Sequence, residues 1–61
     1  MGTTYVKFTP NVPIQRDDEG RDIQVVDGKV CVLYPPDVSL IRDLRSQGMP
    51  DEDIRSWLDM T

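Results

Sequence analysis

The sequence predicts an α+β domain in which a small antiparallel sheet packs against a C-terminal helical hairpin. Asp27-Gly28 lies between two runs rich in β-branched residues, which is a strong signal for a hairpin with a type I′ turn. Two short amphipathic stretches follow, separated by Gly48-Met49-Pro50, a pattern typical of one helix ending and another beginning. We therefore expect a single small domain over residues 1–61, with a β half at 3–34 and a helical half at 36–61.

The hairpin is predicted over residues 22–34, and its turn sets the register. Counting outward pairs residues 26 with 29, 25 with 30, 24 with 31 and 23 with 32. Side chains alternate between the two faces of a strand, so one face of the hairpin is entirely apolar and the other is mixed. We expect the apolar face to be the core face: Ile23, Val25, Val30 and Val32, as against Gln24, Val26, Lys29, Cys31 and Leu33 on the mixed face.

The N-terminal stretch allows two interpretations. Residues 3–9 alternate and are rich in β-formers, which predicts a short strand, and Pro10 ends it. This strand could be a third strand of the protein's own sheet. Alternatively, residues 3–14 form an arm, interrupted by Pro10 and Pro13, that adds to the sheet edge of a partner. Residues 16–22 are expected to form a charged loop.

Two helices are predicted, over 36–47 and 51–60. Proline suits a first helical turn, Gly48 suits a left-handed helix end, and the acidic residues 51–53 suit the positive end of a helix dipole. In the first helix, the apolar stripe consists of Leu40, Ile41 and Leu44, with Val38 beside it. In the second, it consists of Ile54, Trp57, Leu58 and Thr61. Trp57 is expected at the centre of the core, with a role in an interface as the alternative.

Composition narrows the classes of partner. The chain has seven Lys and Arg residues and eleven Asp and Glu residues, which gives a net charge of −4. Because there is no basic stripe, the counterion release that drives nucleic-acid binding is mostly missing, and anionic membranes are disfavoured as well. No apolar run approaches the length of a membrane span, and the N-terminus lacks a hydrophobic signal-peptide core. We therefore expect a cytoplasmic protein with no membrane partner.

Residues that carry chemistry are scarce. The chain has one cysteine and no histidine, which rules out an intrachain disulfide and argues against a structural zinc site. The acidic residues near Gly20 do not fit a calcium-binding loop, because Gln15 and Val26 would stand at its first and last ligand positions. Cys31 has no base to activate it. We therefore expect no enzyme, no cofactor, no metal and no small-molecule substrate.

The helix pair also suggests an alternative function. The segment from Leu44 to Ile54 resembles the first two helices of helix–turn–helix domains, with a Gly-hydrophobic turn, an acidic cap and an isoleucine. The resemblance implies a small DNA-associated transcriptional regulator that uses residues 37–60. However, a further helix would be needed to read the major groove, and the acidic residues 51–53 would repel DNA phosphates.

The function we expect is non-catalytic protein binding. The chain would be a small acidic accessory subunit, adaptor or inhibitor that docks on a larger protein or on itself. By analogy, such chains are common among the accessory proteins of viruses and mobile elements. The residues expected to contact a partner lie on the N-terminal stretch, the acidic loop, the mixed hairpin face and the last helix: Tyr5, Phe8, Asp17, Asp18, Glu19, Val26, Cys31, Leu33, Tyr34 and Met60.

Overall fold

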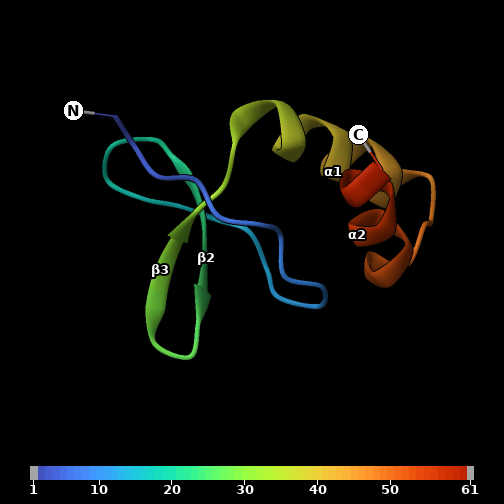
Figure 1. Cartoon of the computed structure of the whole chain (residues 1–61), viewed down its shortest axis with the longest axis horizontal. Coiled ribbons are helices and arrows are strands. Elements are labelled where there is room, and N and C mark those ends of the chain that lie inside the picture. The colour runs from blue at the N-terminus through green and yellow to red at the C-terminus, as the bar shows by residue number, and fades with distance from the viewer. Residues whose placement is uncertain (1, 61) are drawn as a thin grey trace.

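In the computed structural model, which describes residues 2–60, a three-stranded antiparallel sheet precedes two helices (Figure 1). The α+β fold is therefore confirmed. The strands are β1 (Gln15–Arg16), β2 (Asp22–Val26) and β3 (Lys29–Val32), in the spatial order β1-β2-β3, and the helices are α1 (Pro35–Ser46) and α2 (Asp51–Met60).

The β2–β3 hairpin forms in the predicted register. All four predicted cross-strand pairs are present, from Val26 opposite Lys29 to Ile23 opposite Val32. At the turn, Asp27 and Gly28 have φ angles of 51° and 76°. A type I′ turn requires positive φ at both central positions, so these two residues set the register of the hairpin.

The prediction of the core face, in contrast, is wrong. Val25 and Val30 are 40% and 61% exposed, whereas Gln24 on the mixed face is completely buried. Figure 1 shows the reason, since the tip of the hairpin projects away from the helix pair and no other helix or strand of the described residues lies over it. At its base, Ile23 is buried on one face, and Gln24 and Leu33 are buried on the other. Burial therefore depends on the position along the hairpin more than on the face.

This correction can be tested at the tip. We expect Val30→Thr to change the free energy of unfolding by no more than about 0.5 kcal/mol, because the side chain is mostly exposed and threonine is a good strand former. Val38→Thr is the matched control, and it should cost about 1–2 kcal/mol because it places a hydroxyl at a buried position. Urea denaturation followed by circular dichroism measures both values. Equal losses of stability in the two variants would show that the Val30 side chain contributes to the core as the Val38 side chain does.

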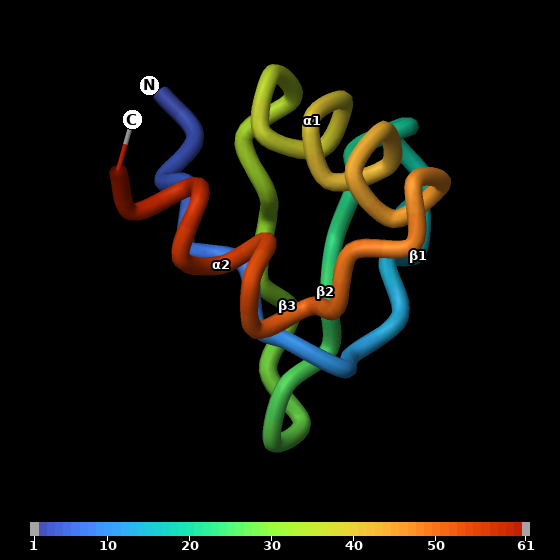
Figure 2. Tube along the Cα trace, turned by 90° about the vertical axis from the view of Figure 1, so that its right-hand side faces the viewer, coloured from blue at the N-terminus to red at the C-terminus, as the bar shows by residue number. Residues whose placement is uncertain are grey.

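The third strand is Gln15–Arg16, within and beside the segment expected to be a charged loop, and residues 3–9 do not form a strand. In that stretch, only Val6 makes a bridge, in parallel orientation, with Leu33. From there residues 3–14, here called the arm, leave the sheet edge and pass between the hairpin and α2 (Figures 1 and 2). The arm does not continue along β3, because it turns inward to bury Phe8 in the core and Pro10 cannot extend a strand ladder.

The helix boundaries follow the local signals. α1 starts one residue before its predicted start, at Pro35, and ends before Gly48, whose φ of 87° is the expected left-handed stop. The N–H of Met49 then donates to the carbonyl of Leu44 (3.1 Å). α2 has its predicted bounds, and the carbonyl of Pro50 accepts the first hydrogen bonds of its backbone. The predicted helical hairpin is confirmed.

The core joins the arm to both helices. Phe8, Ile41, Leu44 and Ile54 form its buried cluster, and partly buried residues pack against this cluster: Ile14, Leu40, Met49 and Leu58. Trp57 is 44% exposed, so its predicted place at the core centre is wrong. The reason is that Phe8, from the distant arm, packs between the helices where an aromatic side chain was expected from α2. Thr61, the last residue of the predicted stripe, lies outside the described residues.

Candidate interaction surface

Two tyrosines form an exposed aromatic pair where the arm meets the start of α1. The rings of Tyr5 and Tyr34 are 5.1 Å apart between centroids and inclined by 63°, in an edge-to-face arrangement. They are 45% and 49% exposed, and the neighbouring Val6 is 41% exposed. We call Tyr5, Val6 and Tyr34 the aromatic surface. Edge-to-face packing is a favourable arrangement of aromatic rings, so the two rings restrain one another.

The backbone on both sides of the pair is held in place. The N–H of Val6 donates to the carbonyl of Val32 (3.0 Å), which ties the arm to the edge of β3. Tyr34 is the N-cap residue of α1, and its carbonyl accepts a hydrogen bond from Val38 (3.1 Å). Pro35 and Pro36 follow, with φ angles that their rings restrict. Neither tyrosine can therefore move far without disturbing the sheet edge or the helix start.

The acidic loop, residues 17–21, is organised by one carboxylate. Asp17 Oδ1 accepts hydrogen bonds from the N–H groups of Glu19 (3.0 Å) and Arg21 (2.7 Å), and Asp17 Oδ2 accepts one from Arg21 Nε (2.7 Å). Burial raises the pKa of Asp17, but these hydrogen bonds and the charge of Arg21 outweigh that effect and lower its pKa below the ordinary value. Asp17 therefore shapes the loop and is not available to a partner.

The remaining acidic residues of the loop face solvent. Asp18 is exposed and has no ion pair among the described residues. The carboxylate of Glu19 is 71% exposed and lies 3.1 Å from Arg21 Nη2. The hydrogen bond with Asp17 raises the pKa of Arg21. Asp18 and Glu19 are therefore the loop residues that a partner could contact.

The structure places the other predicted contact residues in three different parts of the fold. Phe8 and Leu33 are both only 2% exposed, which corrects them from contact residues to core residues, because the arm and the base of the hairpin pack over them. Val26 and Cys31 are partly buried on the mixed face of the hairpin. Met60 is highly exposed on α2. The structure therefore brings Tyr5 and Tyr34 together beside β3, places the acidic loop at the connection of β1 and β2, and leaves Met60 on α2.

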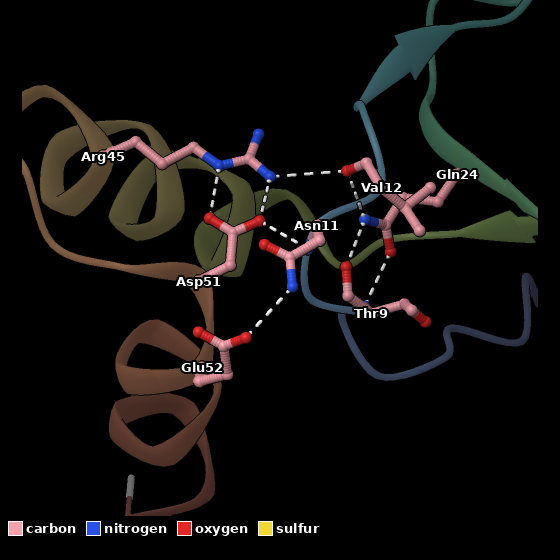
Figure 3. Close-up of polar contacts among 7 residues, drawn as sticks. All are labelled: Thr9, Asn11, Val12, Gln24, Arg45, Asp51 and Glu52. Carbon is pink, nitrogen blue, oxygen red and sulfur yellow. Dashed lines mark hydrogen bonds and ion pairs between the residues drawn. The ribbon is translucent and has the colours of Figure 1, made fainter.

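A polar network that the sequence did not reveal fixes the arm against both helices (Figure 3). Arg45 on α1 donates two hydrogen bonds to Asp51 on α2, from Nε (3.0 Å) and from Nη2 (2.7 Å). Asp51 also accepts the backbone N–H of Asn11 (2.7 Å), and Arg45 donates to the carbonyl of Val12 (3.3 Å). The hydrogen bonds from Arg45 lower the pKa of Asp51, burial opposes them, and the N–H of Asn11 adds to the lowering.

Gln24 makes the second attachment of the arm. Its Nε2 donates to the carbonyls of Thr9 (2.9 Å) and Val12 (3.0 Å), and its Oε1 accepts the N–H of Thr9 (2.8 Å). One buried amide thus bonds the arm as a neighbouring strand would. The only sequence signal for this role was a glutamine opposite Cys31 in the hairpin, and nothing local shows that the arm returns to it.

The described part of the chain offers little else that could hold a ligand. Over residues 2–60, no pocket opens on the surface and no group of three potential metal-binding side chains occurs. Within the same residues, neither helix has the length and apolar composition needed to traverse a bilayer. The features that remain for recognition are therefore exposed side chains and their charges.

Comparison with known proteins gives no assignment. No family model, no curated protein and no solved structure matches the chain.

Proposed function

We propose that the chain is a non-catalytic protein-binding module that docks on a larger protein through the aromatic surface, with the acidic loop at the rim of the contact. The observation that carries this proposal is the Tyr5–Tyr34 pair, which is half-exposed and held on both sides by hydrogen-bonded backbone. Tyrosine is enriched at the residues that dominate binding energy. A tyrosine whose position is already restrained loses less conformational entropy when a partner covers it.

The acidic loop adds selectivity to this surface. Asp18 and Glu19 extend from a loop that Asp17 holds in shape. Exposed carboxylates at an interface rim speed the approach of a basic partner and repel an acidic one. An accessory subunit, adaptor or inhibitor acting in the cytoplasm fits this arrangement, and the partner is a larger protein or a second copy of the chain.

The DNA-associated alternative has no observation in its favour. The helix pair is present, but α2 carries exposed Glu52 and Asp53 in its first turn. These charges repel phosphates, and no described part of the fold presents a basic stripe to compensate.

The proposal is tested by affinity purification from native lysate after nuclease treatment. We expect the tagged wild-type chain to recover one protein in stoichiometric amount. The Tyr5→Ser/Tyr34→Ser variant should recover about tenfold less or lower, because hot-spot tyrosines contribute about 2 kcal/mol or more. Val25→Ser/Val30→Ser removes two exposed apolar side chains elsewhere and is the matched control, expected to retain the partner. Sedimentation of the purified chain identifies self-association.

Two results would contradict the proposal. One is undiminished recovery of the partner by a folded double-tyrosine variant. The other is a wild-type chain that recovers no protein and sediments as a monomer at every concentration.

A further inference from the structure

α2 has a second face, with two large apolar side chains, which the core does not use. Its buried side consists of Ile54 and Leu58. Asp53, Ser56, Trp57 and Met60 have the spacing i, i+3, i+4 and i+7, which places them on one face of the helix. Trp57 is 44% exposed, Met60 is 73% exposed, and the other two are also exposed. We call these four residues the α2 outer face.

The charge of this face is not neutralised by the protein itself. Over residues 2–60, six of the seven Lys and Arg side chains lie in ion pairs, and the seventh, Lys29, is near the hairpin tip. Asp53 takes part in none of these pairs. Among the described residues, the carboxylate of nearby Glu52 accepts a hydrogen bond from the neutral amide of Asn11, at Nδ2 (3.0 Å), and lies in no ion pair. Trp57 therefore lies one helical turn from Asp53, a carboxylate that has no ion-pair partner among the described residues.

This combination favours one kind of occupant. A second copy of the chain would bring its own Asp53 and a net charge of −4 to a face that is already negative, which is repulsive. A lysine or arginine can pair with the free carboxylate, and it is also attracted to the face of a tryptophan ring. The surface is the ridge of a helix, without a pocket among the described residues, so a second helix can pack along it by ridge-into-groove contacts.

We propose that the α2 outer face binds a basic amphipathic helix of another protein, with its apolar residues on Trp57 and Met60 and its lysines or arginines toward Asp53 and Glu52. This site is distinct from the aromatic surface, which belongs to the arm and the start of α1. A chain with both sites connects two proteins, and either site can fail without the other.

The experiment uses Trp57 as its own reporter, because it is the only tryptophan in the chain. The probes are two synthetic amphipathic helical peptides of the same pattern, one of leucine and lysine and one of leucine and glutamate, titrated into the full chain. We expect the leucine–lysine peptide to shift the Trp57 emission to shorter wavelength with saturation, and added salt to weaken the binding. The leucine–glutamate peptide should cause no shift.

Two variants and one control locate the site. Asp53→Lys should weaken binding of the leucine–lysine peptide by about tenfold or more, as expected when a close charge pair is reversed. Met60→Ser should weaken it as well while keeping the reporter. Asp18→Lys makes the same change of charge on the acidic loop and should leave the affinity within about twofold. The loop and α2 lie toward opposite ends of the molecule (Figure 1), and exposed charges separated by more than a Debye length are largely screened. Circular dichroism confirms that each variant is folded.

Three outcomes would overturn the proposal. These are no emission shift with the leucine–lysine peptide, an equal loss of affinity in Asp18→Lys and Asp53→Lys, and a shift that depends on the concentration of the chain alone. The last would make the occupant a second copy. None of these outcomes bears on the tyrosine variants, so the proposed function is tested separately.

Discussion

Gln24→Leu is expected to destabilise the protein by about 3 kcal/mol, because it leaves the N–H and the carbonyl of Thr9 without their partner in a covered position. A buried donor or acceptor left unsatisfied costs about 1–3 kcal/mol. A single core of this size supplies only about 3–5 kcal/mol. The variant should therefore retain no more than about 2 kcal/mol of stability, and urea denaturation at neutral pH measures the loss.

The control for Gln24 is another glutamine in the same sheet. Gln15 lies on β1 and is exposed, so Gln15→Leu should change the free energy of unfolding by no more than about 0.5 kcal/mol.

A second variant, Gln24→Glu, keeps the acceptor and the shape but replaces the donating amide with a carboxylate that faces two carbonyls. We expect it to be unstable at neutral pH and to recover in part in acid, where the protonated carboxyl can donate. A Gln24→Leu protein as stable as wild type would mean that the arm is held without this amide.

Asp51→Asn is expected to cost about 2 kcal/mol at neutral pH, because hydrogen bonds to a charged group contribute about 1.5–3 kcal/mol and this carboxylate joins α1, α2 and the arm. The Arg45–Asp51 side chains are only 32% and 11% exposed, so water screens the pair less than it screens most surface ion pairs. Chemical denaturation of Asp51→Asn, Arg45→Met and the double variant isolates their coupling. The Lys7–Asp59 pair is 75% and 47% exposed, and Lys7→Met should cost less than about 0.5 kcal/mol.

The same pair predicts how stability depends on pH. The pKa of Asp51 is lower in the folded chain than in the unfolded chain. Its contribution is therefore fully present above the unfolded pKa of about 3.9 and is lost as pH falls through the folded pKa. The stability difference between wild type and Asp51→Asn should thus be constant above about pH 5 and shrink below about pH 4. A difference that does not change down to the acid transition would show that the Asp51 charge contributes nothing.

Local signals account for the parts of the fold that could be predicted. Asp27-Gly28 determined a turn and, through it, four cross-strand pairs. Gly48 ended one helix, and the bounds of α2 were those expected. In each case, the residues that decide the conformation are close in sequence to the residues that adopt it, so backbone preference alone was sufficient.

The parts that could not be predicted depend on contacts between distant residues. Gln24 bonds Thr9 across 15 positions, and Asn11 bonds Asp51 across 40. No propensity of the arm indicates that Phe8 enters the core in place of Trp57, because that exchange depends on how the arm crosses the sheet. Among the candidate contact residues, Tyr5 and Tyr34 form a pair, whereas Phe8 and Leu33 are buried. Both outcomes depend on the path of the arm.

The route of the arm has a consequence for synthesis on the ribosome. Phe8 is made early, but the residues that enclose it, Ile41, Leu44 and Ile54, are made late. Until α2 has emerged, the three strands and α1 are complete, but Ile54, which closes the core around Phe8, is missing. A nascent chain stalled before Asp51 would therefore carry an incompletely covered phenylalanine and an arm without its attachment to α2, open to chaperones and proteases. The arm, although synthesised before both helices, is among the last segments to reach its final position.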